Sequence, residues 1–187
     1  MRLGKWQLLA VCFVVLVALD QWTKYLAVEH LTALFTRVGA ETTFEKVAQF
    51  YKARHLEGLA TAPYIVHPAW WRMSYAENPG AAFSFGTGFT FVFPLIAIAV
   101  VVVIVRKSRE LGSLAWALAL GGLLGGAVGN LIDRLFRDPG WMQGHVVDFI
   151  FVKHFAVFNV ADAAITCSAV AMVVLALMGI DLNGKRA

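Results

Sequence analysis

Four long apolar runs constrain the fold of this chain more than any other feature. They cover about residues 6–28, 89–105, 111–135 and 159–180 of 187. A helix needs about 20 mostly apolar residues to cross a bilayer core that is ~30 Å thick, and the runs approach or exceed that length. We therefore predict one all-α integral membrane domain over residues 1–187, with four transmembrane helices and an outward-facing loop subdomain.

The composition agrees with this class and excludes a water-soluble globule. Hydrophobic residues make up 59% of the chain and charged residues only 15%, whereas soluble domains carry about 25% charged residues. The net charge of +4 does not indicate nucleic-acid binding, because the basic residues cluster at the ends of apolar runs. Cys12 and Cys167 each lie inside an apolar run, and their spacing indicates neither a metal site nor a disulfide framework.

The basic clusters also predict an orientation. They lie at residues 2–5, 106–109 and 185–186, and four spans place all three on one side, which the positive-inside rule makes cytoplasmic. Both termini are then cytoplasmic, and the loops at about 29–88 and 136–158 face outward. The first run follows basic residues as a secretory signal does, but no A-x-A-like cleavage site follows it, so we expect a retained helix.

The first outer loop contains a further helical pattern. Thr42-Thr43-Phe44-Glu45 reads as a capping box, and apolar residues continue at helical spacing to Tyr51. We interpret the segment as a short amphipathic helix that either lies on the bilayer surface or packs on the rest of the loop.

Polar residues within the apolar runs are informative, because an ionisable side chain at a helix centre costs on the order of 2.5 to 3.5 kcal/mol on insertion scales. Asp20 and Lys24 are four residues apart and share one helix face, which predicts a neutralised, structural pair. Asn78-Pro79-Gly80 breaks any helix. It is explained equally well by a plain turn or by a place where another group approaches the backbone.

A third polar set follows a glycine-rich stretch. Gly-x-x-x-Gly pairs within residues 121–129 let helices pack backbone to backbone. Directly after them, Asn130, Asp133 and Arg134 lie at i, i+3 and i+4 on one face. We expect Asp133 to neutralise and orient Arg134, whose guanidinium offers five donors to a peptide carbonyl. The alternative is an interfacial salt bridge of little energetic value.

The fourth set contains two acids. Asp148 lies just outside the third run, and Asp162 lies one turn into the fourth, on the same helix face as Asn159. Asp162 cannot easily stay charged alone in an apolar setting. If the short loop folds Asp148 back towards it, the two carboxyl groups share one proton: the ionised group activates water and the protonated group donates to a substrate carbonyl. Helix caps or packing contacts explain the same spacing.

Other chemistries find less support. The five histidines are scattered without a His-Glu-x-x-His pattern, and the chain contains neither Gly-x-Ser-x-Gly nor a phosphate-cradling loop. We therefore expect neither a metal nor a cofactor. A small transporter and a non-catalytic scaffold are the alternatives to an enzyme, although transporters tend to place carboxylates near the midplane between inverted repeats, and no repeat is visible.

Five segments together resemble the prolipoprotein signal peptidases (signal peptidase II), bacterial inner-membrane aspartic proteases with four spans. In chain order they are Asp20-Gln21-x-Thr23-Lys24, Asn78-x-Gly80-Ala81-Ala82-Phe83, Gly126-Ala127-x-Gly129-Asn130-x-x-Asp133-Arg134, Val147-Asp148-Phe149 and Phe158-Asn159-x-Ala161-Asp162. The chain departs from the family in the stretch between Lys24 and Asn78, which is longer than we expect for a compact member.

The resemblance implies a substrate and a location. The substrate is a diacylglyceryl-modified prolipoprotein, cut immediately before its lipidated cysteine to release the signal peptide. The peptide inhibitor globomycin and membrane lipid are the other expected partners, and we expect a monomer. The implied location is the bacterial inner membrane, with the active site near the periplasmic face.

The resemblance also implies residue roles. It makes Asp148 and Asp162 the catalytic dyad. The residues that it places in contact with substrate or inhibitor, or along the same cleft, are Asn78, Gly80, Asn130, Arg134 and Asn159. Those with a mainly structural role are Asp20, Lys24 and Asp133.

Overall fold

The computed structural model describes residues 3–37, 71–80, 90–152, 155 and 157–186. The predicted amphipathic helix between residues 42 and 58 and the Ala81–Phe83 part of the second motif lie outside the described residues.

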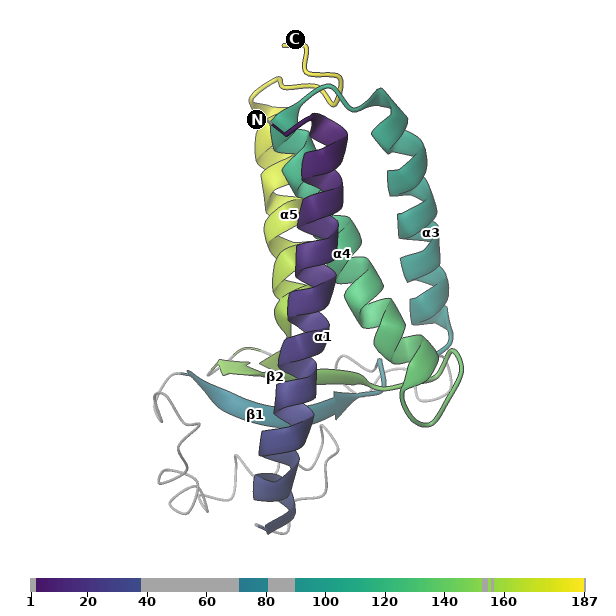
Figure 1. The fold of residues 1–187 in the computed structure, drawn as a ribbon, viewed down its shortest axis with the longest axis vertical. Helices are drawn as coiled ribbons and strands as arrows, with labels where there is room; N and C mark the ends of the chain where they lie inside the picture. The colour runs from purple at the N-terminus through teal and green to yellow at the C-terminus, as the bar shows by residue number, and fades with distance from the viewer. Residues whose placement is uncertain (1–2, 38–70, 81–89, 153–154, 156, 187) are drawn as a thin grey trace.

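Four helices form a bundle around α4 (Figure 1). They are α1 (Lys5–Arg37), α3 (Val92–Lys107), α4 (Leu114–Phe136) and α5 (Val160–Leu177), and a short 3₁₀ turn, η2 (Ser108–Glu110), follows α3. Helix α4 packs against each of the other three helices. Its glycines permit this close approach: a Cβ atom added at Gly121 would lie 2.8 Å from the carbonyl oxygen of Leu9 in α1, and one at Gly126 would lie 2.5 Å from that of Ala161 in α5.

The outer surface of this bundle is apolar, as a lipid-facing surface must be. Large hydrophobic side chains such as Val15, Val103 and Val173 are more than half exposed. Soluble proteins rarely expose continuous apolar surface on this scale. The helices therefore face an apolar solvent, and the prediction of a multi-pass membrane protein is confirmed.

Three of the four predicted spans have helices that are long and apolar enough to cross a bilayer. They are Lys5–Leu31, Leu114–Phe136 and Val160–Leu177. The run predicted at 89–105 corresponds to α3, which has 16 residues and stops at the η2 turn. That α3 also spans the membrane stays a prediction.

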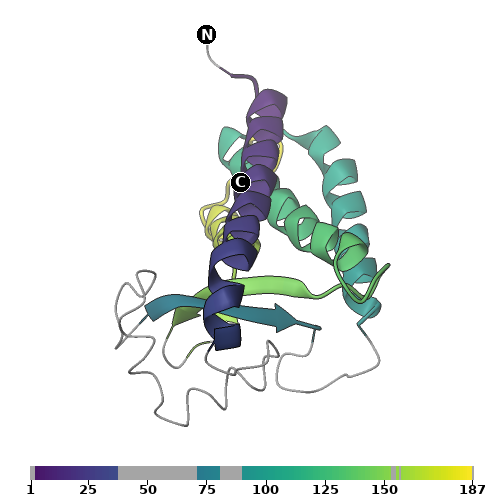
Figure 2. The same cartoon turned by 60° about the horizontal axis from the view of Figure 1, so that its bottom comes forward.

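The fold is mostly helical, as predicted, but a small sheet at one end of the bundle departs from the all-α prediction. Strands β1 (Trp71–Asn78), β2 (Val146–Val152) and β3 (Val157–Phe158) pair antiparallel in the order β1-β2-β3. The sheet lies at the lower end of the bundle in both views (Figures 1 and 2). All three lie in segments that were expected to be loops. The β-branched and aromatic residues of β2 favour a strand.

Alternation along the strands buries one face of this sheet against α1. Tyr75, Val147 and Phe149 form a core cluster with Ala27 and Leu31 of α1. Because of this contact, α1 continues beyond its expected end near residue 28 and passes the sheet (Figure 1). This packing fixes the position of the sheet along α1. Both chain termini lie at the opposite end of the bundle.

Candidate active site

The predicted polar residues meet where the sheet reaches the ends of α4 and α5. Asp148 lies on β2, and Asp162 lies in the first turn of α5. Asn130 and Arg134 come from one face of α4, and Asn78 ends β1. Four elements that are distant in sequence therefore contribute to one site.

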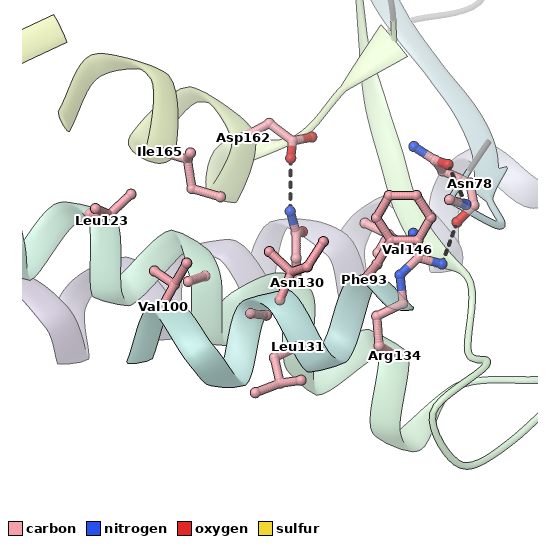
Figure 3. A pocket seen from close by; sticks show the side chains of 14 residues that line it. Asn78, Phe93, Val100, Leu123, Asn130, Leu131, Arg134, Val146, Asp162 and Ile165 are labelled. Atoms are coloured by element: carbon pink, nitrogen blue, oxygen red, sulfur yellow. Dashed lines mark hydrogen bonds between the residues drawn. The ribbon is translucent and has the colours of Figure 1, made fainter. Parts of the chain in front are cut away.

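A capping box holds the carboxyl group of Asp162. The backbone N–H of Asp162 donates to Oδ1 of Asn159 at 2.9 Å, and Oδ2 of Asp162 accepts from the backbone N–H of Asn159 at 3.2 Å. This arrangement satisfies donors that a helix start otherwise leaves without partners. Oδ1 of Asp162 accepts from Nδ2 of Asn130 at 2.7 Å (Figure 3). The helix-cap interpretation is therefore correct for Asp162, and it does not remove the carboxyl group from the site.

Asp148 is the more deeply buried of the two acids, with 1% of its surface exposed. Oδ1 accepts from Nδ2 of Asn159 at 2.7 Å, and Oδ2 accepts from Nδ2 of Asn78 at 3.0 Å. Asn159 thus contacts both carboxyl groups and connects them. The fold therefore brings both carboxyl groups to the same asparagine.

Burial and a like charge act together on this group. Desolvation, followed by the negative charge of Asp162, raises the pKa of Asp148 from its usual range to about 7. The hydrogen bonds from Asn78 and Asn159 and the charge of Lys24 oppose the shift. Near neutral pH, this carboxyl group is therefore poised between its protonated and ionised forms.

A cavity of about 380 Å³ opens beside these groups. Its polar wall contains Asn78, Asn130, Arg134 and Asp162 (Figure 3). Asp148 is not among the lining residues. The remaining lining residues are Gly80, Phe93, Ile96, Ala97, Val100, Leu123, Ala127, Leu131, Val146 and Ile165. One cavity therefore offers a carboxyl group, amides and a guanidinium on one side and hydrocarbon on the other.

Arg134 joins the strands to the helix bundle. Its Nη1 donates at 2.9 Å to the carbonyl oxygen of Asn78 and at 2.9 Å to that of Gly144, and its guanidinium lies 5.6 Å from the ring centroid of Phe93. Among the described residues, the ion pairs of Asp133 are to Lys24 and Arg137. The expected orientation of Arg134 by direct contact with Asp133 was therefore wrong, although the charge of Asp133 still acts on the guanidinium. Adjacent helix residues do not face each other.

Gly80 completes the turn after β1. Its N–H donates to Oδ1 of Asn78 at 2.8 Å, and its φ of +100° lies in the region that favours glycine. A Cβ atom at this position would lie 2.5 Å from the ring of Phe93. The plain-turn interpretation is correct, and the turn also lines the cavity.

The predicted Asp20–Lys24 pair is confirmed, with 2.8 Å between Nζ and Oδ2 and both side chains buried. Sequence reasoning missed three contributors, namely Gln21, Arg137 and Phe93. Gln21 donates to Asp20 and to the carbonyl oxygen of Gly129. Arg137 lies four residues after Asp133, a spacing that could have indicated the pair. No local signal identifies Phe93, because it meets Arg134 only through the fold.

Metal chemistry has no evident site in the part of the chain that the structure describes. Within these residues, no group of three or more His, Cys, Asp or Glu side chains could hold a metal ion.

The fold and the site define this chain as a polytopic membrane protein with a carboxyl-containing cavity at one end of its helix bundle. Two solved structures, both described as bacterial membrane enzymes determined by the in meso method, share this fold. The structure at 2.3 Å resolution matches with a TM-score of 0.63 and 23% identity over 89% of this chain and 85% of that chain. The structure at 1.9 Å resolution matches with a TM-score of 0.60 and 25% identity over 89% and 90%.

The sequence comparisons are more specific. The family described as signal peptidase (SPase) II matches residues 12–178. A lipoprotein signal peptidase of Anaeromyxobacter sp. (strain Fw109-5) is 47% identical in an alignment that covers 92% of this chain and 85% of that protein. A second, from Streptomyces coelicolor, is 57% identical over 115 residues, which cover 62% of this chain and only 56% of that protein.

This chain therefore belongs to the signal peptidase II family. Membership indicates a membrane protease of lipoprotein processing. It favours the enzyme over the transporter and the scaffold that the sequence left open.

Proposed function

We propose that this protein is an aspartic endopeptidase that removes the signal peptide from diacylglyceryl-modified bacterial prolipoproteins, cutting before the lipidated cysteine. Family membership supports the substrate class. The observation that carries the proposed chemistry is the connection of Asp148 and Asp162 through Asn159 beside a cavity with one polar and one apolar side.

In the proposed mechanism, the two carboxyl groups hold one proton between them. The ionised carboxylate takes a proton from a water molecule while the water oxygen attacks the scissile carbonyl carbon. The protonated carboxyl group donates its proton to the carbonyl oxygen. Collapse of the tetrahedral intermediate breaks the C–N bond: the carboxyl group that took the proton from water gives it to the leaving amine, and a hydroxyl proton of the intermediate returns to the other carboxylate. The raised pKa of Asp148 supports this division of roles, because one group must keep a proton near neutral pH.

The polar neighbours have distinct proposed roles. Asn130 and Asn159 hold the carboxyl groups, and Asn78 and Gly80 shape the edge of the cleft. Nη1 of Arg134 donates to two backbone carbonyls, so the other N–H groups of its guanidinium would donate to the substrate. Asp20, Lys24 and Asp133 keep a structural role in this proposal.

The proposed setting is the bacterial inner membrane, with α3 as the fourth span and both termini cytoplasmic. The sheet and cavity then lie at the periplasmic face, where water reaches the peptide bond and the apolar wall faces the lipid-modified substrate. We expect a monomer that binds globomycin in the same cavity.

The test is cleavage of a lipidated prolipoprotein by the purified protein, with and without globomycin, with the cut located by mass. We expect one cut before the lipidated cysteine, blocked by globomycin. Asp148→Asn and Asp162→Asn should each abolish cleavage while the protein stays folded, and the exposed Asp181→Asn serves as the matched control. Normal turnover by either active-site variant would remove that residue from the mechanism.

A further inference from the structure

Lys24 is a buried cation whose hydrogen-bonding capacity is fully used. Its Nζ atom lies 2.8 Å from Oδ2 of Asp20, 2.8 Å from Oδ2 of Asp133 and 2.8 Å from Oδ1 of Asn130. Its side chain has 0% exposure. An ammonium group has three donors, and these three acceptors engage all of them. Lys24 therefore has no donor left for a substrate.

The ion pairs of Lys24 do not involve the two active-site acids: within the described residues they are with Asp20 and Asp133. Asp133 also accepts from Nε of Arg137 at 2.8 Å. Two cations, Lys24 and Arg137, thus face two carboxylates, Asp20 and Asp133. Buried charges need such pairing. The contact of Lys24 with Asn130, a neutral side chain, is a hydrogen bond in addition to these ion pairs, and the charge of Lys24 also acts on Asp148.

That contact determines which way the Asn130 amide points. Oδ1 of Asn130 accepts from Lys24 at 2.8 Å and from Nδ2 of Asn159 at 3.2 Å, while Nδ2 donates to Oδ1 of Asp162 at 2.7 Å. A reversed amide would set its NH₂ group against two donors and its oxygen against a carboxylate. Buried donors left unpaired in this way are costly. Only one orientation satisfies all three neighbours.

We propose that Lys24 is a positioning residue that acts through Asn130: its ammonium group holds the side-chain amide of Asn130 with Nδ2 towards Asp162. Lys24 thereby keeps in place the donor that orients one of the two active-site carboxyl groups. The inference rests on the proposed function, because it concerns the same site, and it goes beyond a structural role for the Asp20–Lys24 pair.

The test compares kcat and KM for Lys24→Gln, Asn130→Ala and the double variant on the lipidated prolipoprotein. A hydrogen bond to a charged group corresponds to a rate factor of about tenfold to a hundredfold, so Lys24→Gln should lower kcat by that factor with little change in KM. The double variant should be no slower than Asn130→Ala alone, because the two residues act in series. Losses that multiply would overturn the proposal.

A charge-balanced variant separates positioning from folding. Lys24→Gln leaves Asp20 without its cation and can unfold the protein. Combining Asp20→Asn with Lys24→Gln removes one charge of each sign, so Arg137 still neutralises Asp133, and Asn at position 20 keeps an oxygen for the N–H of Ala161. This variant should keep its Tm and still lose kcat. A wild-type kcat at an unchanged Tm would contradict the proposal. The exposed Lys107→Gln is the matched control.

A second readout does not depend on cleavage. The side-chain amide resonances of Asn130, identified by their loss in Asn130→Ala, should shift in the charge-balanced variant. If the wild-type protein cleaves no lipidated prolipoprotein, the proposed function fails, and the resonances still decide the role of Lys24. Unchanged resonances would mean that Lys24 does not orient this amide.

Discussion

At the scale of the residue, Asp148 links the stability of the protein to pH. Its folded-state pKa of about 7 lies above its ordinary value of 3.8, so between about pH 4 and pH 7 the native state holds a proton that the unfolded chain releases. Stability should fall as pH rises through that window and level off above it. Asp148→Asn removes the titrating group.

We therefore expect Asp148→Asn to flatten this slope and to raise the Tm in detergent at pH 8 relative to the wild type. Each unit of pKa shift corresponds to about 1.4 kcal/mol, so the free energy of unfolding at pH 8 should rise by a few times this amount at most. Thermal unfolding of both proteins from pH 4 to pH 8 measures it. Parallel curves for the two proteins would show that burial does not raise this pKa.

Gly80 provides a second prediction at this scale. Gly80→Ala should impair both stability and cleavage, because the new Cβ is strained at a φ of +100° and strikes the ring of Phe93. Strain of this kind costs about 1 to 3 kcal/mol. Gly140 is the matched control: its φ is +131°, but nothing lies within 4 Å of an added Cβ. Gly140→Ala should lower the Tm and spare kcat/KM. Equal losses of kcat/KM in both variants would contradict a specific role for the Gly80–Phe93 contact.

At the scale of the element, the glycine face of α4 sets the distance to α5 and so the position of Asp162. Gly126→Ala would bring a Cβ to 2.5 Å from the carbonyl oxygen of Ala161 and 2.7 Å from Cγ1 of Ile165. Overpacking of this kind costs about 1 to 3 kcal/mol. The variant should lower both Tm and kcat, whereas Leu118→Ala on the exposed face of α4 should lower neither markedly. A normal kcat in Gly126→Ala would show that α5 can move without displacing Asp162.

The elements also show where sequence reasoning succeeded and where it failed. Polar side chains such as Asp20 and Lys24 were identifiable because burial in an apolar run demands a partner. The sheet was not identifiable, because β1 lies in a long connection between apolar runs and its described partner, β2, is about 70 to 80 residues away in sequence. The partner of Arg134 was missed for a similar reason: its acceptors are backbone carbonyls that the sheet brings into reach.

At the scale of the whole molecule, the number of membrane spans determines whether the two termini lie on the same side of the membrane. Both termini lie at the end of the bundle opposite the sheet (Figure 1). Three crossings by α1, α4 and α5 alone would put the termini on opposite sides of the membrane, so α3 must supply the fourth crossing for the termini to share a side. The basic loop at Arg106 and Lys107 then predicts that this side is cytoplasmic.

Cysteine labelling tests this topology. In a chain whose Cys12 and Cys167 are replaced by alanine, Trp141→Cys introduces an exposed thiol in the loop before β2, and Asp181→Cys introduces one near the C-terminus. A membrane-impermeant maleimide should label position 141 in intact spheroplasts and position 181 only after permeabilisation. Labelling of position 181 in intact spheroplasts would put the C-terminus outside. The cavity would then need another route to a substrate that reaches it from the periplasmic face, because sheet and C-terminus lie at opposite ends of the bundle.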